Sequence, residues 1–215
     1  MNLRTASIVV LAALALASCR SSGDLVVEQG VGITAVRTVC PAVGIANHTG
    51  DVTLFSPAGA TTADAIDLTA VITNVRSTCT ETGDEVRSDA TFEVQALRRN
   101  TEGARTVELT TFGTVLRGGD AVVAKRLRTV TLQFADGQER ASASGMGGAI
   151  INRAEATLPA DIRAQITRER EAGDTDAAVD PLTLPEVRAA LARANFELLV
   201  GFQLTDAQLQ YNATR

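Results

Sequence analysis

Residues 196–204 read FELLVGFQL and carry the clearest secondary-structure signal in the chain. Apolar side chains stand at every second position: Phe196, Leu198, Val200, Phe202 and Leu204. Because side chains alternate between the two faces of a β-strand, this period of two predicts a strand with one apolar face. An apolar face of this kind usually belongs to a core. If it lay uncovered at an edge or a face, it would be a surface for docking a partner.

Further strands are predicted upstream, in the middle of the chain. Residues 91–97 alternate strictly between apolar and polar side chains, and residues 67–79 are rich in Thr, Val and Ile. Three other segments also read as strands separated by turns that contain Gly and Asp: residues 106–116, 121–134 and 140–158. In the polar tail, Leu209 and Tyr211 are expected to continue the last strand. The pattern predicts a mainly β fold, an antiparallel β-sandwich or barrel-like domain.

Two short helices are predicted as an insert over about residues 159–195, before the C-terminal strand. In residues 159–171, Ile162 and Ile166 are four apart among charged residues. Thr183 and Glu186 have the spacing of a capping box. The residues that follow have the i, i+3, i+4, i+7 spacing of an apolar helix face: Val187, Ala190, Leu191 and Ala194. We expect both amphipathic helices to pack on the sheet.

The N-terminus has the features of a secretory signal. Arg4 supplies a positive charge, and residues 8–17 form an unbroken apolar run. A run of about ten residues is typical of a signal peptide, whereas a helix that spans a bilayer needs about twenty. We therefore expect this segment to direct export and then to be removed.

The end of this segment resembles the lipobox of bacterial lipoproteins, on Leu16-Ala17-Ser18-Cys19. The resemblance implies that Cys19 carries lipid and becomes the first residue of the mature chain. Because Arg20 and not Asp follows the cysteine, it also implies the periplasmic face of the outer membrane, as in Gram-negative envelope lipoproteins. The alternative is an ordinary signal peptide cleaved near Ala17 or Ser18. The expected organisation is a signal peptide over residues 1–18, a lipidated tether over 19–24 and a β-rich periplasmic domain over 25–215.

The number of cysteines agrees with this interpretation. The chain has three cysteines, and lipidation of Cys19 would leave Cys40 and Cys79 as a pair. In an oxidising periplasm such a pair is more often a disulfide than two free thiols. The alternative is two buried thiols, and no C-x-x-C spacing suggests a redox pair.

The sequence offers no motif for a cofactor, a metal or nucleic acid. The net charge of −5 gives no basic face for nucleic acid, and His48 is the single histidine, in a predicted surface loop. Residues 142–148 (SASGMGG) match neither a nucleophile elbow nor a phosphate-binding loop. Small residues in a strand instead predict close approach of a neighbouring backbone, or a bulge. No catalytic residue is nominated.

Location therefore supplies the functional hypothesis. The expected function is a non-enzymatic scaffold or docking module, held at the membrane through Cys19 and binding another envelope protein. Confinement to a membrane surface would raise the effective concentration for such a partner. Two alternatives are a hydrolase of envelope material that uses a carboxylate pair, and a carrier of lipid or another small molecule.

Overall fold

The structure is a computed structural model that describes residues 38–171 and 173–215. The predicted signal peptide, Cys19 and the tether lie outside the described residues. The described part falls into two compact units, one of residues 38–168 with 179–215 and one of residues 169–178, and each is described by itself. In the described part, no helix has both the length and the apolar character needed to cross a membrane.

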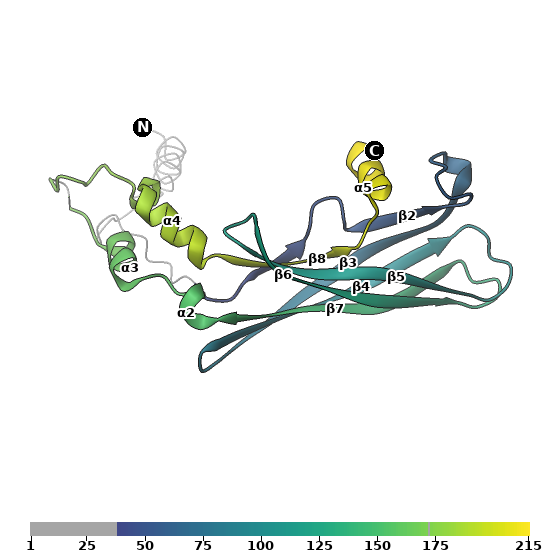
Figure 1. Cartoon of the computed structure of the whole chain (residues 1–215), viewed down its shortest axis with the longest axis horizontal. Helices are drawn as coiled ribbons and strands as arrows, with labels where there is room; N and C mark the ends of the chain where they lie inside the picture. Colours follow the sequence, from purple (N-terminus) through teal and green to yellow (C-terminus); the bar gives the residue numbers. More distant parts are fainter. Residues whose placement is uncertain (1–37, 172) are drawn as a thin grey trace, which may run out of the picture. The chain divides into compact units, whose positions relative to one another are not determined.

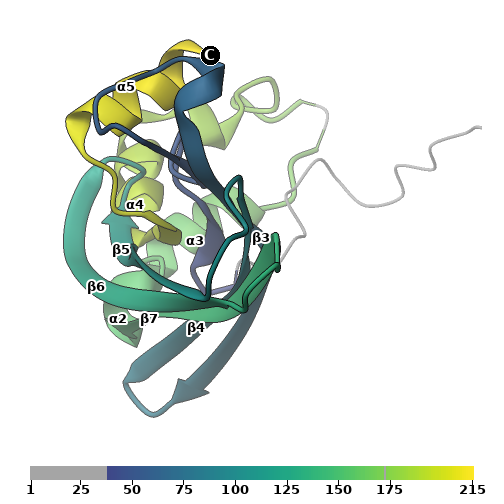
Figure 2. The same ribbon diagram turned by 90° about the vertical axis from the view of Figure 1, so that its right-hand side faces the viewer.

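The larger unit is built from two four-stranded sheets, which confirms the mainly β prediction (Figure 1). The first sheet has the order β1-β8-β5-β6, and its strands are Ala42–Ile45, Phe196–Phe202, Arg105–Arg117 and Ala121–Phe134. The second has the order β2-β3-β4-β7, and its strands are Asp51–Phe55, Ile66–Thr82, Glu85–Arg98 and Arg140–Asn152. The pairing of β1 with β8 is parallel, whereas the other strand pairs of the described part are antiparallel. Figure 2 shows β5 and β6 curving toward β7, so the sandwich is barrel-like.

The apolar stripe of residues 196–204 belongs to the core. Its strand β8 lies between β1 and β5, inside the first sheet. The four side chains of the stripe that lie on β8 are buried: Phe196, Leu198, Val200 and Phe202. Leu204 follows the strand and packs, partly buried, against the same core. The stripe is thus core, as the pattern favoured, and the alternative of a partner surface formed by these five residues is wrong because their side chains pack in or against the core.

The glycines of β7 allow close packing, as the small residues of this segment predicted. A Cβ atom at Gly145 would lie 2.2 Å from Cε2 of Phe92, so the ring occupies the place of a side chain. Between the sheets, a Cβ atom at Gly113 of β5 would lie 3.3 Å from Cα of Gly147. The two sheets thus approach each other through backbone at this point.

The helices of the insert pack differently from the prediction. They are α2 (Arg153–Ala156), α3 (Ala160–Thr167) and α4 (Pro185–Ala194), with a 3₁₀ turn, η2, at Pro181–Thr183. The apolar faces of α3 and α4 meet each other in a cluster separate from the sandwich core: Ile162, Ile166, Val187 and Ala190. Helices α3 and α4 therefore bury each other's apolar stripes instead of packing on the sheet as expected, whereas Ala156 of α2 belongs to the sandwich core.

Three boundaries also differ from the prediction. Strand β7 ends at Asn152, and not near residue 158. The Asn152 side chain accepts a hydrogen bond from the backbone N–H of Ala154 and so caps α2, which begins at the next residue. The predicted capping box is absent, since Thr183 Oγ1 donates to the carbonyl of Asp180. The tail is a helix, α5 (Asp206–Thr214), and not a continued strand. Thr205 and Gln208 form a capping box that starts it.

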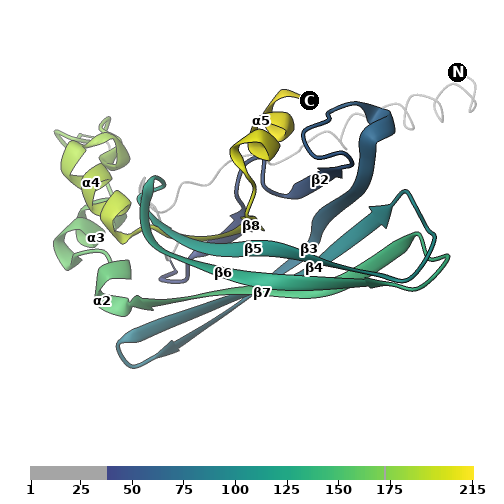
Figure 3. The ribbon, with the colours of Figure 1, turned by 45° about the vertical axis from the view of Figure 1, so that its right-hand side comes forward.

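Helix α5 covers β2 at the C-terminus (Figure 3). The amide nitrogen of Asn212 donates to the backbone carbonyls of His48 and Asp51, at 2.9 and 2.8 Å. Phe55 and Tyr211 meet edge to face, with ring centroids 5.2 Å apart. Polar and aromatic contacts therefore hold the tail against the second sheet.

An ion pair joins the two sheets between Asp67 of β3 and Arg105 of β5. Two hydrogen bonds of 2.7 and 2.6 Å connect the guanidinium with both carboxylate oxygens. The hydrogen bonds from Arg105 lower the pKa of Asp67 below its ordinary value of 3.8. A carboxyl group with a lowered folded-state pKa stabilises the fold above its unfolded-state pKa, and this stability is lost as the pH falls through the folded-state pKa.

We expect Asp67→Asn to lower the free energy of unfolding by about 0.5 to 1 kcal/mol at pH 7, since solvent screens a partly exposed pair. The difference from the parent protein should shrink as the pH is lowered from about 4 to about 2. Urea unfolding at a series of pH values measures it. Glu108→Gln, an exposed carboxylate on the same strand as Arg105, is the matched control and should show a small difference at each pH. A constant Asp67→Asn difference over this range would contradict the assignment.

Candidate functional site

The predicted disulfide is present, between Cys40 and Cys79. Cys40 lies just before β1 of the first sheet, and Cys79 lies near the end of β3 in the second. The bond therefore joins the segment just before the first strand of one sheet to the second strand of the other sheet. Cys19, the predicted site of lipid attachment, lies outside the described residues.

The most exposed part of the sandwich is the first half of β6. The strand forms one edge of the first sheet, and β7 forms one edge of the second. A short turn joins them, but within the described residues no strand pairing connects them. The first nine residues of β6, 121–129, are all exposed. Along an edge strand, the N–H and C=O groups of every second residue lack a partner strand.

Two adjoining hollows lie between β6 and the second sheet. The larger, of about 690 Å³, is lined by residues of β3, β4, β6 and β7. The smaller, of about 290 Å³, continues along β6 and β7. Because Arg128 and Met146 line both hollows, we treat them as one feature. We call it the edge groove.

Arginine dominates the charged lining of the edge groove. Its four arginines are Arg76, Arg87, Arg126 and Arg128, and its two carboxylates are Asp89 and Glu93. Cations thus outnumber anions here, although the whole chain has a net charge of −5. The groove is a local basic region on an acidic protein.

Two of the four arginines are already engaged. Arg87 Nε donates to Asp89 Oδ2 at 2.8 Å, and this contact raises the pKa of Arg87. Arg76 Nε donates to Asn74 Oδ1 at 3.0 Å. For the guanidinium groups of Arg126 and Arg128, by contrast, the described part of the chain provides neither a hydrogen bond nor an ion pair. Their guanidinium groups have the capacity to bind an anionic group.

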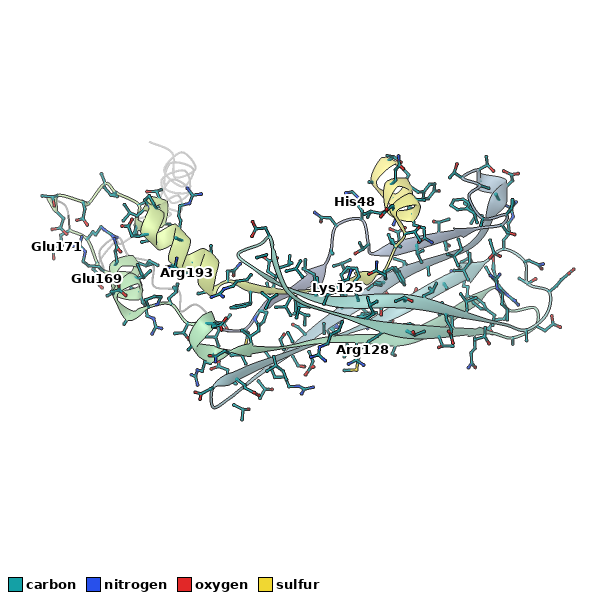
Figure 4. The ribbon with its side chains drawn as sticks, viewed as in Figure 1. His48, Lys125, Arg128, Glu169, Glu171 and Arg193 are labelled. Atoms are coloured by element: carbon teal, nitrogen blue, oxygen red, sulfur yellow. A yellow bond between two sulfur atoms is a disulfide. The ribbon has the colours of Figure 1, made fainter. Side chains whose placement is uncertain are left out.

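Exposed apolar side chains lie beside these cations. Three are on β6, Val122, Val123 and Leu127, and two are on β7, Met146 and Ile150, which line the groove. Leu127 exposes 57% of its surface. Lys125 lies over the ring of Phe112, with Nζ 4.7 Å from the ring centroid, and can be followed with Arg128 in Figure 4. The β6 edge therefore offers backbone groups, positive charge and apolar contacts together.

Sequence reasoning missed this site. It predicted residues 121–134 as a strand and assigned the face of Val130, Leu132 and Phe134, which is indeed buried. It did not separate the exposed first half from the buried second half. The sequence did contain a signal, the run KRLR at residues 125–128. Arg128 stands two residues before the buried Val130 and shares its face of the strand, so the apolar face gives way to charge at this position.

Within residues 38–171 and 173–215, no group of three or more His, Cys, Asp or Glu residues could hold a metal ion. His48 lies in the loop between β1 and β2, in the left-handed region at φ 61°, and its backbone carbonyl accepts a hydrogen bond from Asn212.

No protein-family model, curated protein or solved structure matches the chain.

Proposed function

We propose that this chain is a lipid-anchored docking module of the bacterial envelope, which acts by binding another envelope protein and not by catalysis. Lipid on Cys19 would hold it at the periplasmic face of the outer membrane. The edge groove would be the binding surface. The observation that carries the proposal is the β6 edge without a paired strand, on which the guanidinium groups of Arg126 and Arg128 lack partners among the described residues.

The anchor and the groove would act together. Two or more acyl chains, at about 0.8 kcal/mol per buried methylene, retain a soluble domain at a membrane. The predicted tether of residues 19–24 is short, so the domain would stay near the membrane surface. At such confinement a weak contact suffices, because effective concentrations in the millimolar range are typical of short tethers. A disulfide is compatible with an oxidising compartment.

A photo-crosslinking amino acid at Leu127 tests this function in intact cells. We expect a discrete adduct with one envelope protein, because Leu127 is exposed beside the free edge. Replacing Cys19 by serine should greatly reduce the adduct, since the tether is lost. Mass spectrometry of the purified parent protein should find acyl chains on Cys19 as its first residue.

Glu102, exposed in the connection between β4 and β5 and absent from the groove lining, is the control position and should give no discrete adduct. Equal adducts from Leu127 and Glu102 would show that the groove is not the docking surface. An unmodified Cys19, or a retained leader, would remove the anchor from the proposal.

A further inference from the structure

We propose that the occupant of the edge groove is an extended acidic segment of a partner protein, which adds to β6 as a new strand. This inference rests on the proposed docking function and names the chemistry of its partner. It follows from three properties of the same stretch, residues 121–129: its backbone, its charge and its alternation.

The backbone of β6 can accept a strand. Nine exposed residues at about 3.3 Å each extend about 30 Å, which is enough for a segment of six to nine residues. Since β6 pairs with β5 on one side and pairs with no described strand on the other, its second set of N–H and C=O groups is available. Addition of a peptide to such an edge is a common mode of recognition, in which backbone hydrogen bonds give affinity and side chains give specificity.

The charges of β6 select an acidic partner. Arg126 and Arg128 are two residues apart, so they lie on one face of the strand and both line the groove. Carboxylates at alternate positions of an added strand would face them, and opposite charges across strands are stabilising. Arg76 lies in the same groove as Arg128 and adds to the positive charge.

The other face of the added strand would be apolar. Val123, Lys125 and Leu127 alternate with the groove-lining positions, and Val123 and Leu127 are exposed. Apolar side chains of the partner would pack against them. The expected partner segment therefore alternates acidic and apolar residues.

The same charges disfavour a second copy of this chain. Antiparallel pairing of β6 with β6 of another molecule would place the basic run 125–128 close to its own copy. Like charges on directly paired strands are destabilising, and charge of this kind is how proteins protect exposed edges. The charges of the groove thus favour binding of an acidic segment over pairing with a second copy of this chain.

Peptide binding to the full chain, purified with its N-terminal modification in detergent, tests the inference. The probe is a fluorescent nine-residue peptide of alternating glutamate and valine, and its anisotropy gives the Kd. We expect binding that weakens with salt, and hydrogen–deuterium exchange should show protection of the amides of residues 121–129. The double variant Arg126→Glu/Arg128→Glu should weaken binding by about tenfold or more, as expected for loss of close charge pairs.

Matched controls separate charge from strand addition. Arg163→Glu/Arg188→Glu makes the same change in net charge on exposed positions of α3 and α4 and should leave the Kd unchanged. A peptide with lysine in place of glutamate should not bind the parent protein but should bind the Arg126→Glu/Arg128→Glu variant. A glutamate peptide N-methylated at alternate backbone amides, in both registers, should lose at least about tenfold in affinity in one register.

Several results would overturn the inference. Equal binding of the methylated and unmethylated peptides would exclude strand addition, and equal binding of the lysine and glutamate peptides would exclude charge selection. Absence of binding by all peptides would also overturn it, as would a concentration-dependent dimer that Arg126→Glu/Arg128→Glu abolishes. In each case the Leu127 adduct in cells still judges the docking function separately, because it does not depend on the partner's chemistry.

Discussion

Replacing Arg98 by methionine is expected to lower the free energy of unfolding by about 3 to 5 kcal/mol, because four backbone carbonyls lose a charged hydrogen-bond donor. Arg98 is the last residue of β4, and its side chain is 1% exposed. Its guanidinium donates to four backbone carbonyls at 2.7 to 2.9 Å: those of Thr101, Gly103, Ala135 and Gln138. Urea unfolding of the purified protein measures the loss.

The physical reason is the number of groups left without partners. The four carbonyls belong to two connections, β4 to β5 and β6 to β7, which the guanidinium joins. Methionine fills a similar volume but has no donors, and each carbonyl left unpaired away from water costs about 1 to 3 kcal/mol before the loops relax. The Arg98 guanidinium also lies 5.2 Å from the ring centroid of Phe134.

Two further variants make this result specific. Arg140→Met removes an exposed arginine at the start of β7 and should change the free energy of unfolding by no more than about 0.5 kcal/mol. Arg98→Lys keeps the charge but not the planar fork of donors, so it should recover only part of the loss. A loss below about 1 kcal/mol for Arg98→Met would show that water or relaxed loops satisfy the carbonyls.

The strands could be predicted because their signal is local. Strict alternation in residues 91–97 and 196–204 depends only on which side chains face the core. The first segment lies in β4, and residues 196–202 of the second form β8. The position of β8 inside its sheet could not be predicted, because it depends on which strands become its neighbours. For that reason the sequence left open whether the stripe of Phe196 and Leu198 was core or surface.

The helices and the site show the limits of local patterns. Ile162 and Val187 were correctly placed on apolar helix faces, but the spacing of residues does not name the partner, and α3 and α4 pack on each other. Arg98 and Arg99 are adjacent in sequence, yet only Arg98 is buried, because the loop that follows it and the distant β6–β7 loop both close around it. The edge groove likewise is lined by residues of both sheets, which no single segment encodes.

Replacing Cys40 and Cys79 together by serine is the second change with a large expected effect. The bond spans a sequence separation of 39, and closing a loop of that length reduces the entropy of the unfolded chain. On the chain-entropy model its removal should lower the free energy of unfolding by about 3 to 4 kcal/mol. Urea unfolding of the oxidised parent protein and of the double variant measures the difference.

Reduction of the parent protein provides the control, because it breaks the same bond without changing the sequence. It should give the same loss, whereas Cys19→Ser should keep the bond and the stability of the domain. Equal stability of the oxidised and reduced protein would show that the bond does not constrain the unfolded chain. Thiol labelling of protein taken directly from cells adds a test of location: Cys40 and Cys79 should resist labelling until reductant is added. Free thiols at both positions would argue against the oxidising compartment in which the proposed anchor and docking role are set.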